Sequence, residues 1–202
     1  TTEKAFSASM CIPTDGLEAD ELQRRENRAR EVYRFILLRS SEFRDQGDDG
    51  IDVLVICQQA LEKHLIKLGL PDNVEMAHFN ATRGIDRWGG VRCLITIGRT
   101  LPSPSDVEVL AENLSGWVVD KVSGKQWYPR QSAGLDVGGI GLTVQSEQHP
   151  DEMVEAVRWQ ICEAELIQVA GRGRGVNRLP NNPLQLDLLS NVCLPMTVDQ
   201  PV

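Results

Sequence analysis

The segment at 168–178 has the residue types that best suit chemistry on a phosphate group, and its sequence is QVAGRGRGVNR. Three of the four positive charges after residue 150 fall in it, at Arg172, Arg174 and Arg178. A guanidinium group donates paired hydrogen bonds to phosphate oxygens, and the interleaved glycines leave the backbone flexible and accessible. Taken alone, the segment is equally typical of a solvated basic loop after a helix. The choice between these two interpretations of the segment depends on the secondary structure and motifs around it.

Other kinds of site find less support in the sequence. The five cysteines are widely spaced and never form a Cys-x-x-Cys pair, and there are three histidines, so neither a zinc site nor a disulfide framework is expected. A P-loop needs Gly-Lys followed by Ser or Thr, whereas Gly124-Lys125 is followed by Gln126. The glycines of 136–142 lack the spacing of a dinucleotide-binding loop and predict a β-turn.

The elements that must position the segment follow an alternation of strands and helices. The run 51–57 is short, apolar and rich in β-branched residues, which is typical of a strand buried on both faces of a parallel sheet. Apolar residues then recur at helical spacing within 58–70. Further strands are expected at 74–79 and 91–98, and an amphipathic helix is expected ahead of them at 20–43.

The second half of the chain interrupts this alternation and then resumes it. A helix is expected to begin near Ser103 or Ser105, and 117–145 mixes β-forming residues with glycines, which predicts a hairpin or small meander. A helix at 151–170 leads into the basic segment, and a last strand is expected within 183–195. We therefore expect an α/β fold with a parallel sheet flanked by helices and an inserted β-hairpin region.

Composition limits the class of protein. The chain has 202 residues, of which 41% are hydrophobic and 25% charged, enough for one large domain with a full core. No apolar run is long enough to cross a membrane and the first residues show no signal pattern, so we expect a cytoplasmic protein without membrane contact. The net charge of −8 argues against a general basic surface, so any contact with nucleic acid must be local.

Three segments follow one another in an informative order. They are VLVICQQALEKHL at 53–65, ATRGIDRWGGVRCLITIG at 81–98 and QVAGR at 168–172. Together they resemble motifs IV, V and VI of the second RecA-like lobe of superfamily 2 helicases and related ATP-driven translocases. The middle segment carries the Arg-Gly-hydrophobic-Asp core of motif V, and the last carries the Gln-x-x-Gly-Arg of motif VI at a helix end. The resemblance covers about 50–100 and 150–195.

The resemblance implies a RecA-like α/β domain that supplies half of an ATP-hydrolysing site. In that family the first lobe binds most of ATP and Mg²⁺ through its P-loop and acidic box, and motif VI arginines reach across to the γ-phosphate. Arg172 matches the arginine after the motif glycine and is the expected finger. The resemblance implies supporting roles there for Arg174 and Gln168, and contacts with the nucleotide for Gly84, Asp86 and Arg178.

The resemblance also implies that the motif V-like loop contacts a nucleic-acid strand, DNA in preference to RNA. Its backbone near Thr82 and Arg83 would face strand phosphates, with Arg87 close by. Trp88 is a candidate for stacking on a base, although tryptophan more often packs in a core. The family works by closing and opening two lobes along the strand, so the second implied partner is an N-terminal P-loop lobe.

The chain departs from the family pattern in three places. The second motif VI arginine usually lies three residues after the first, where this chain has Gly175, so Arg174 and Arg178 remain alternatives. The hydroxyl residue that often opens motif V is replaced by His78. About fifty residues at 100–150 separate two motifs that are usually close. We expect this insertion to be an extra layer on the sheet, with a partner surface or a strand-separating pin as alternatives.

These observations give one main hypothesis and two alternatives. We expect 1–49 to be a leading segment with a connecting helix, and 50–202 to be the C-terminal lobe of an ATP-dependent helicase or translocase, inactive without the P-loop lobe of the same longer protein. The alternatives are a non-catalytic nucleic-acid-binding or regulatory module, and an α/β domain that binds a phosphorylated small molecule. Salt-dependent binding to a single strand would exclude the last.

Overall fold

The computed structural model describes residues 6–44, 50–82, 84–85, 87–122 and 127–200. The chain divides into two compact units. The sheet unit runs up to Arg99 and resumes at Gln168–Ser190. The hairpin unit comprises Thr100–Ile167 and the chain from Asn191 onward. Each unit therefore contains segments that are distant in sequence.

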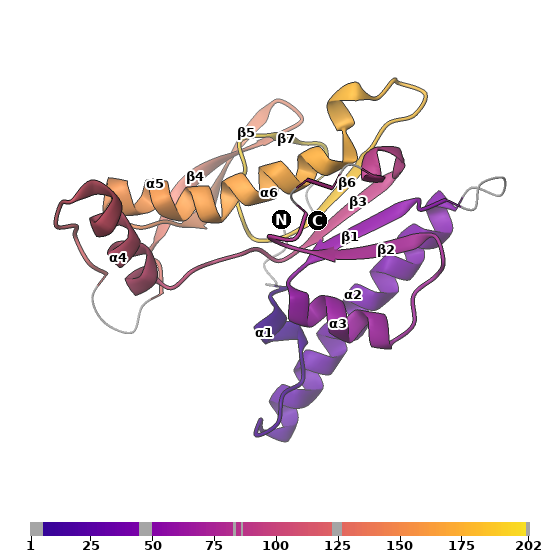
Figure 1. Ribbon diagram of the computed structural model, residues 1–202, viewed down its shortest axis with the longest axis horizontal. Helices are drawn as coiled ribbons and strands as arrows, with labels where there is room; N and C mark the ends of the chain where they lie inside the picture. The colour runs from indigo at the N-terminus through magenta and orange to yellow at the C-terminus, as the bar shows by residue number, and fades with distance from the viewer. Residues whose placement is uncertain (1–5, 45–49, 83, 86, 123–126, 201–202) are drawn as a thin grey trace. The chain divides into compact units, whose positions relative to one another are not determined.

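Four parallel strands form the sheet of the sheet unit (Figure 1). They are β1 (Val53–Cys57), β2 (Val74–His78), β3 (Cys93–Ile97) and β6 (Gln185–Leu189), in the spatial order β2-β1-β3-β6. Every residue of β1 and β3 is buried, because both faces of a parallel sheet are covered. The predicted α/β class, with a parallel sheet flanked by helices, is confirmed.

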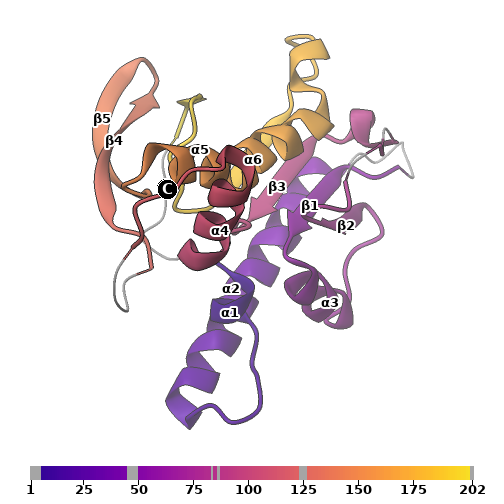
Figure 2. The ribbon, with the colours of Figure 1, turned by 60° about the vertical axis from the view of Figure 1, so that its left-hand side comes forward.

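Helices α2 (Ala19–Phe43) and α3 (Gln59–Lys67) cover one face of this sheet, together with the short helix α1 (Ala8–Cys11) (Figures 1 and 2). Their apolar faces share one core with the strands, as Ile36 of α2 and Leu61 of α3 illustrate. The spacing of apolar residues in the sequence predicted both long helices and the side of each that is buried.

Polar contacts fix α2 against the sheet. Arg39 Nε donates to Asp187 Oδ2 of β6 at 2.7 Å. Ser40 Oγ donates to Asn73 Oδ1, just before β2, at 2.6 Å, and both of these residues are buried. Buried polar groups with hydrogen-bond partners hold a helix in one register. The helix that we expected to be a connector beside the lobe thus lies in the same compact unit as the sheet.

An antiparallel hairpin dominates the hairpin unit (Figure 2). It consists of β4 (Arg130–Val137) and β5 (Ile140–Glu147), and the short strand β7 (Thr197–Val198) pairs with β4. The turn residues Gly138 and Gly139 have φ angles of 57° and 86°, which glycine adopts without steric cost. The hairpin lies between β3 and β6 in chain order, and the predicted insertion of a β-hairpin is confirmed.

Two helices of this unit begin at well-defined caps. Helix α4 (Pro104–Ser115) begins after Ser103, whose Oγ accepts the Asp106 N–H at 3.2 Å. Helix α5 (Glu152–Ile161) begins after Asp151, whose carboxylate accepts two backbone N–H groups. Side-chain oxygens at these positions satisfy N–H groups that have no partner inside the helix.

The single helix predicted over 151–170 is wrong in one respect, because two helices replace it. Helix α5 ends at Cys162, whose φ of −99° and ψ of −72° depart from helical values, and α6 (Glu163–Ala170) follows. Arg158 Nη2 donates to Glu163 Oε1 across this break at 2.7 Å. Neither glycine nor proline marks the position, so the sequence offered no breaker signal.

No helix within the described ranges combines the length and the apolar character that crossing a membrane requires.

Candidate functional site

The loop after β2 holds the predicted nucleic-acid contacts. Arg83 and Asp86 lie outside the described residues. Thr82 is 1% exposed, so its hydroxyl is not available to a strand in this conformation. Gly84 is exposed and has a φ of 75°, a conformation that favours glycine. The chain at Gly84 therefore adopts a backbone conformation that favours glycine over other residues.

Trp88 lies in the 3₁₀ turn η1 (Arg87–Gly90) and is 2% exposed. Its indole Nε1 donates to Glu75 Oε1 of β2 at 2.9 Å, and Arg87 forms an ion pair with the same carboxylate. The Arg87 guanidinium lies 5.7 Å from the centre of the Trp88 ring. Burial leaves no ring face for a base, so Trp88 packs the turn against β2 and the stacking role that we considered does not fit this conformation.

The basic segment after α6 forms the Gly-Arg loop, residues 171–178. It contains two 3₁₀ turns, η2 (Gly171–Gly173) and η3 (Gly175–Asn177), joined at Arg174, whose φ is 51°. Gly173 is buried, and a Cβ built on it would lie 2.4 Å from Leu184 Cδ2. Glycine at that position thus lets the loop lie close to the chain that leads into β6.

Arg178 fixes the Gly-Arg loop to the sheet unit. Its Nη2 donates to the carbonyls of Val91 at 2.5 Å and Gly173 at 3.0 Å, and its Nε donates to Gly173 at 3.3 Å. One guanidinium group therefore ties the loop to the residues just before β3. These contacts give Arg178 a structural role, which favours Arg174 as the second arginine next to Arg172.

The other predicted residues of this region differ in exposure. Gln168, near the end of α6, and Arg174 are exposed, whereas Arg172 is partly buried. The Nε atom of Arg172 is buried and has no hydrogen-bond partner within the described residues. A guanidinium N–H that gives up water without gaining a protein acceptor carries a desolvation cost that an anion could offset.

The structure brings η1 and η2 together within the sheet unit. A Cβ on Gly89 of η1 would lie 3.0 Å from Arg174 Cδ, so the arginine side chain passes directly over the glycine. Two segments that are far apart in sequence, each singled out by its motif, thus form one surface. Thr82, which precedes η1, is buried instead of contributing to it.

A second polar pair lies at the carboxyl ends of the strands, where α/β sheets usually bind ligands. His78 ends β2, and its Nδ1 lies 2.7 Å from Glu62 Oε2 of α3. Gln58 follows β1 and forms two hydrogen bonds there. Its Oε1 accepts the Ala8 N–H, and its Nε2 donates to the carbonyl of Arg99, which follows β3, at 2.9 Å. The sequence marked His78 only as a departure from a motif and gave no sign of its partner.

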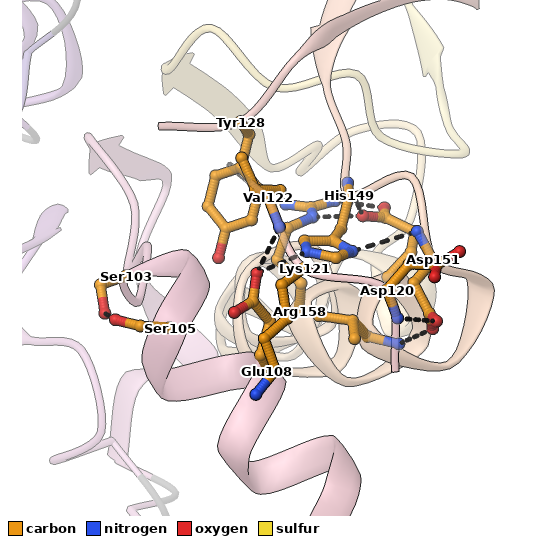
Figure 3. Close-up of polar contacts among 12 residues, drawn as sticks. Ser103, Ser105, Glu108, Asp120, Lys121, Val122, Tyr128, His149, Asp151 and Arg158 are labelled. Atoms are coloured by element: carbon orange, nitrogen blue, oxygen red, sulfur yellow. Dashed lines mark hydrogen bonds and ion pairs between the residues drawn. The ribbon is translucent and has the colours of Figure 1, made fainter. Parts of the chain in front are cut away.

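The hairpin unit contains a buried polar network that the sequence did not reveal (Figure 3). Arg158 is 1% exposed and donates to Glu155 from both Nε and Nη2 at 2.7 Å, and to Glu163 at 2.7 Å. His149 Nδ1 accepts the Asp151 N–H at 3.1 Å. The i,i+3 spacing of Glu155 and Arg158 was visible, but their burial was not.

Glu108 and Tyr128 complete this network. His149 Nε2 lies 3.1 Å from Glu108 Oε1, and the same oxygen accepts the Val122 N–H at 2.8 Å (Figure 3). The Tyr128 ring lies 5.8 Å from the Arg158 guanidinium, and its hydroxyl donates to the Pro102 carbonyl at 3.0 Å. Each polar side chain is thus held by neighbours of its own unit, which is typical of a structural network.

Burial and charge pairing alter the pKa values of this network. Burial alone would lower the pKa of Arg158, but the hydrogen bonds from Glu155 and Glu163 raise it above the ordinary arginine value. Burial also raises the pKa of the Tyr128 hydroxyl. Both groups therefore keep one protonation state across the physiological range, so neither is placed to act as an acid or base.

Most of the cysteines are shielded from solvent. Cys11, Cys57, Cys93 and Cys162 are buried, and Cys193 is partly exposed. Burial raises the pKa of the Cys11 thiol to about 11. A thiol that stays protonated is a poor nucleophile.

Within the described ranges, no group of three or more His, Cys, Asp or Glu residues is arranged to hold a metal ion. Comparison with known proteins returned no matching family model, curated protein or solved structure.

Proposed function

We propose that this chain is the second lobe of an ATP-dependent nucleic-acid helicase or translocase, and that its arginines complete a nucleotide site formed mainly by a P-loop lobe. The packing of η1 against η2 carries the proposal. Segments that resemble motifs V and VI share one surface in the sheet unit, as a common site requires.

The three arginines of the Gly-Arg loop take different parts in this proposal. Arg172 is the proposed finger, because it follows the glycine of the motif VI-like segment, and its buried Nε has no protein acceptor within the described chain. Arg174 accompanies it from the exposed side of the loop, and Arg178 positions both by holding Gly173. Gln168 lies near the end of α6, just before the loop that carries both arginines.

Nucleotide binding divides between the two lobes. Guanidinium donors of the Gly-Arg loop fit phosphate oxygens in number and geometry, so Arg172 and Arg174 would hold the terminal phosphate of ATP. Mg²⁺ would be held mainly by the P-loop lobe. When bound, MgATP supplies an activated phosphoryl group, and the arginines stabilise the charge that develops on it.

The strand would run past the loop after β2. Arg87 remains an exposed cation there, although Glu75 neutralises part of its charge. The contacts of Thr82 with a strand would be limited to its backbone, because its side chain is buried. Local contacts of this kind suit a chain of net charge −8 that must release its strand in every cycle.

ATP turnover tests the proposal directly. Arg172→Ala, in the protein that joins this chain to its P-loop lobe, should lower strand-stimulated ATP hydrolysis about 1,000-fold and leave ATP binding nearly unchanged. Arg30→Ala is the matched control, because Arg30 lies exposed on α2 and, among the described residues, its ion pair is with Glu26 of the same helix at 3.7 Å. Turnover that survives Arg172→Ala would remove the finger assignment, and salt-dependent strand binding without turnover would favour the non-catalytic binding module.

A further inference from the structure

His78 and Glu62 form an oriented pair at the carboxyl end of β2. The Nδ1–Oε2 distance of 2.7 Å joins the last residue of the strand to the first turn of α3. The His78 side chain is 29% exposed and that of Glu62 is 14% exposed. The carboxylate is therefore mostly covered, while the imidazole keeps an accessible edge.

The hydrogen bond decides which face of the imidazole is available. An ionised carboxylate only accepts, so Nδ1 carries the proton, and Nε2 is left to accept or to gain a second proton. Nε2 makes no contact within the described part of the chain. Protonation at Nε2 gives a cation with a second N–H donor.

The elements packed on β2 place few other ionisable groups against this ring. On α3 the contact is Glu62, and on β1 the Cα partner of His78 is Cys57. Burial raises the pKa of Cys57, so this thiol is neutral. On β2 itself, Glu75 points to the opposite face of the sheet, since alternate residues of a strand face opposite ways, and it is held by Arg87.

We propose that Nε2 of His78 contacts a backbone phosphate of the bound nucleic-acid strand, with Glu62 as the positioning residue. The inference deepens the proposed function and rests on it. The pair lies at the edge of the sheet where α/β domains bind ligands, and it offers an oriented donor that becomes a cation on protonation. Within the described chain no serine, threonine or cysteine side chain is bonded to His78, so the pair has no nucleophile to activate. The contact is strongest when the imidazole carries both protons, so the strand should bind more tightly in mild acid.

Fluorescence anisotropy with a labelled oligothymidylate tests the contact, at about pH 6 and about pH 8 and constant salt. The unmodified chain should bind about fivefold more tightly at the lower pH. His78→Gln should lose this difference, and His78→Lys should bind tightly at both values. Glu62→Gln should weaken binding at the lower pH, because the imidazole loses the carboxylate that orients it. His64→Gln, on the same helix, is the matched control and should keep the full pH response.

The outcomes separate this inference from the proposed function. If His78→Gln binds the strand with the same pH response as the unmodified chain, the phosphate contact is wrong while the strand-binding role stands. If the unmodified chain fails to bind at either pH, both are overturned. The imidazole NMR signals of His78 in the unmodified chain give a second readout that needs no variant. They should shift on addition of the oligonucleotide, and unchanged signals in the bound chain would overturn the contact.

Discussion

Arg158 in the hairpin unit and Arg172 in the sheet unit differ in the partners of their guanidinium groups. The Arg158 guanidinium is 1% exposed, donates to Glu155 and Glu163, and faces the Tyr128 ring. Arg172 is partly buried, and its Nε has no acceptor in the described part of the chain. Arg158 thus has two carboxylate partners although its Nη1 is buried without a hydrogen-bond partner, whereas the described chain offers no acceptor to Nε of Arg172.

This difference concerns the desolvation cost of one residue type. Removing a guanidinium from water costs several kcal/mol, roughly, and carboxylates at hydrogen-bond distance offset that cost for Arg158. For Nε of Arg172 the described chain supplies no acceptor that would offset the same cost. Two carboxylate partners therefore give Arg158 a structural role, but an unpartnered buried nitrogen does not by itself set Arg172 apart, because Arg158 Nη1 is another one in the described chain.

The largest expected effect is on the buried arginine. Arg158→Ala should lower the free energy of unfolding by about 3–5 kcal/mol, because Glu163 would be left buried, and Glu155 partly buried, without their cation. Urea denaturation followed by circular dichroism measures the change. Arg30→Ala, whose side chain is 63% exposed, is the control and should be nearly neutral. A loss as small as that of the control would show that the network does not hold the unit together.

The next effect concerns the shape of the Gly-Arg loop. Gly173→Ala should destabilise the chain by about 1 kcal/mol, because the new Cβ would meet Leu184 Cδ2 and displace the side chain. Gly171→Ala is the matched control, since a Cβ there would have no atom within 4 Å. Thermal denaturation of the pair measures the difference. Equal midpoints for the two variants would mean that close packing against Leu184 does not define the loop.

A smaller effect concerns acid stability of the hairpin unit. Backbone N–H groups of Asp120 and Val154 lower the pKa of Asp151 below its ordinary value of 3.8. Because the folded-state pKa is the lower one, the ionised cap stabilises the fold above about pH 4, and this contribution is lost as the pH falls through the folded pKa. Asp151→Asn should flatten the acid dependence of the melting temperature between about pH 5 and about pH 2. An unchanged slope would contradict this account of the cap.

The smallest expected effect on stability is at the other arginine. Arg172→Ala should change the free energy of unfolding by less than about 0.5 kcal/mol, since Arg172 makes no hydrogen bond through Nε within the described chain. The same urea titration applies. A loss comparable to that of Arg158→Ala would place Arg172 among the structural arginines and remove the contrast.

Most of the fold could be predicted because its signals are local. Apolar runs such as 93–97 predicted buried strands, and a glycine pair at 138–139 predicted the hairpin turn. The break at Cys162 could not be predicted, because no helix-breaking residue marks it and the ion pair between Arg158 and Glu163 that spans it forms only in the folded chain.

The candidate site was less predictable than the fold. The sequence selected Arg172 and Arg174 by motif, but it could not distinguish Arg174 from Arg178, since the bonds from Arg178 to Val91 and Gly173 arise only in the folded chain. Burial likewise decides against base stacking by Trp88. Long-range contacts of this kind have no signature in residue types or in local spacing.

Cys193 is a suitable site for chemical labelling of the chain. The other four thiols are buried, while Cys193 is partly exposed and its Sγ lies 3.0 Å from the Gly134 carbonyl of β4. Burial raises its pKa, so maleimide coupling should be slow near neutrality and faster in mild alkali. A fluorophore could therefore be attached to the unmodified chain at one place beside the hairpin, where it would report on that unit without any engineered cysteine.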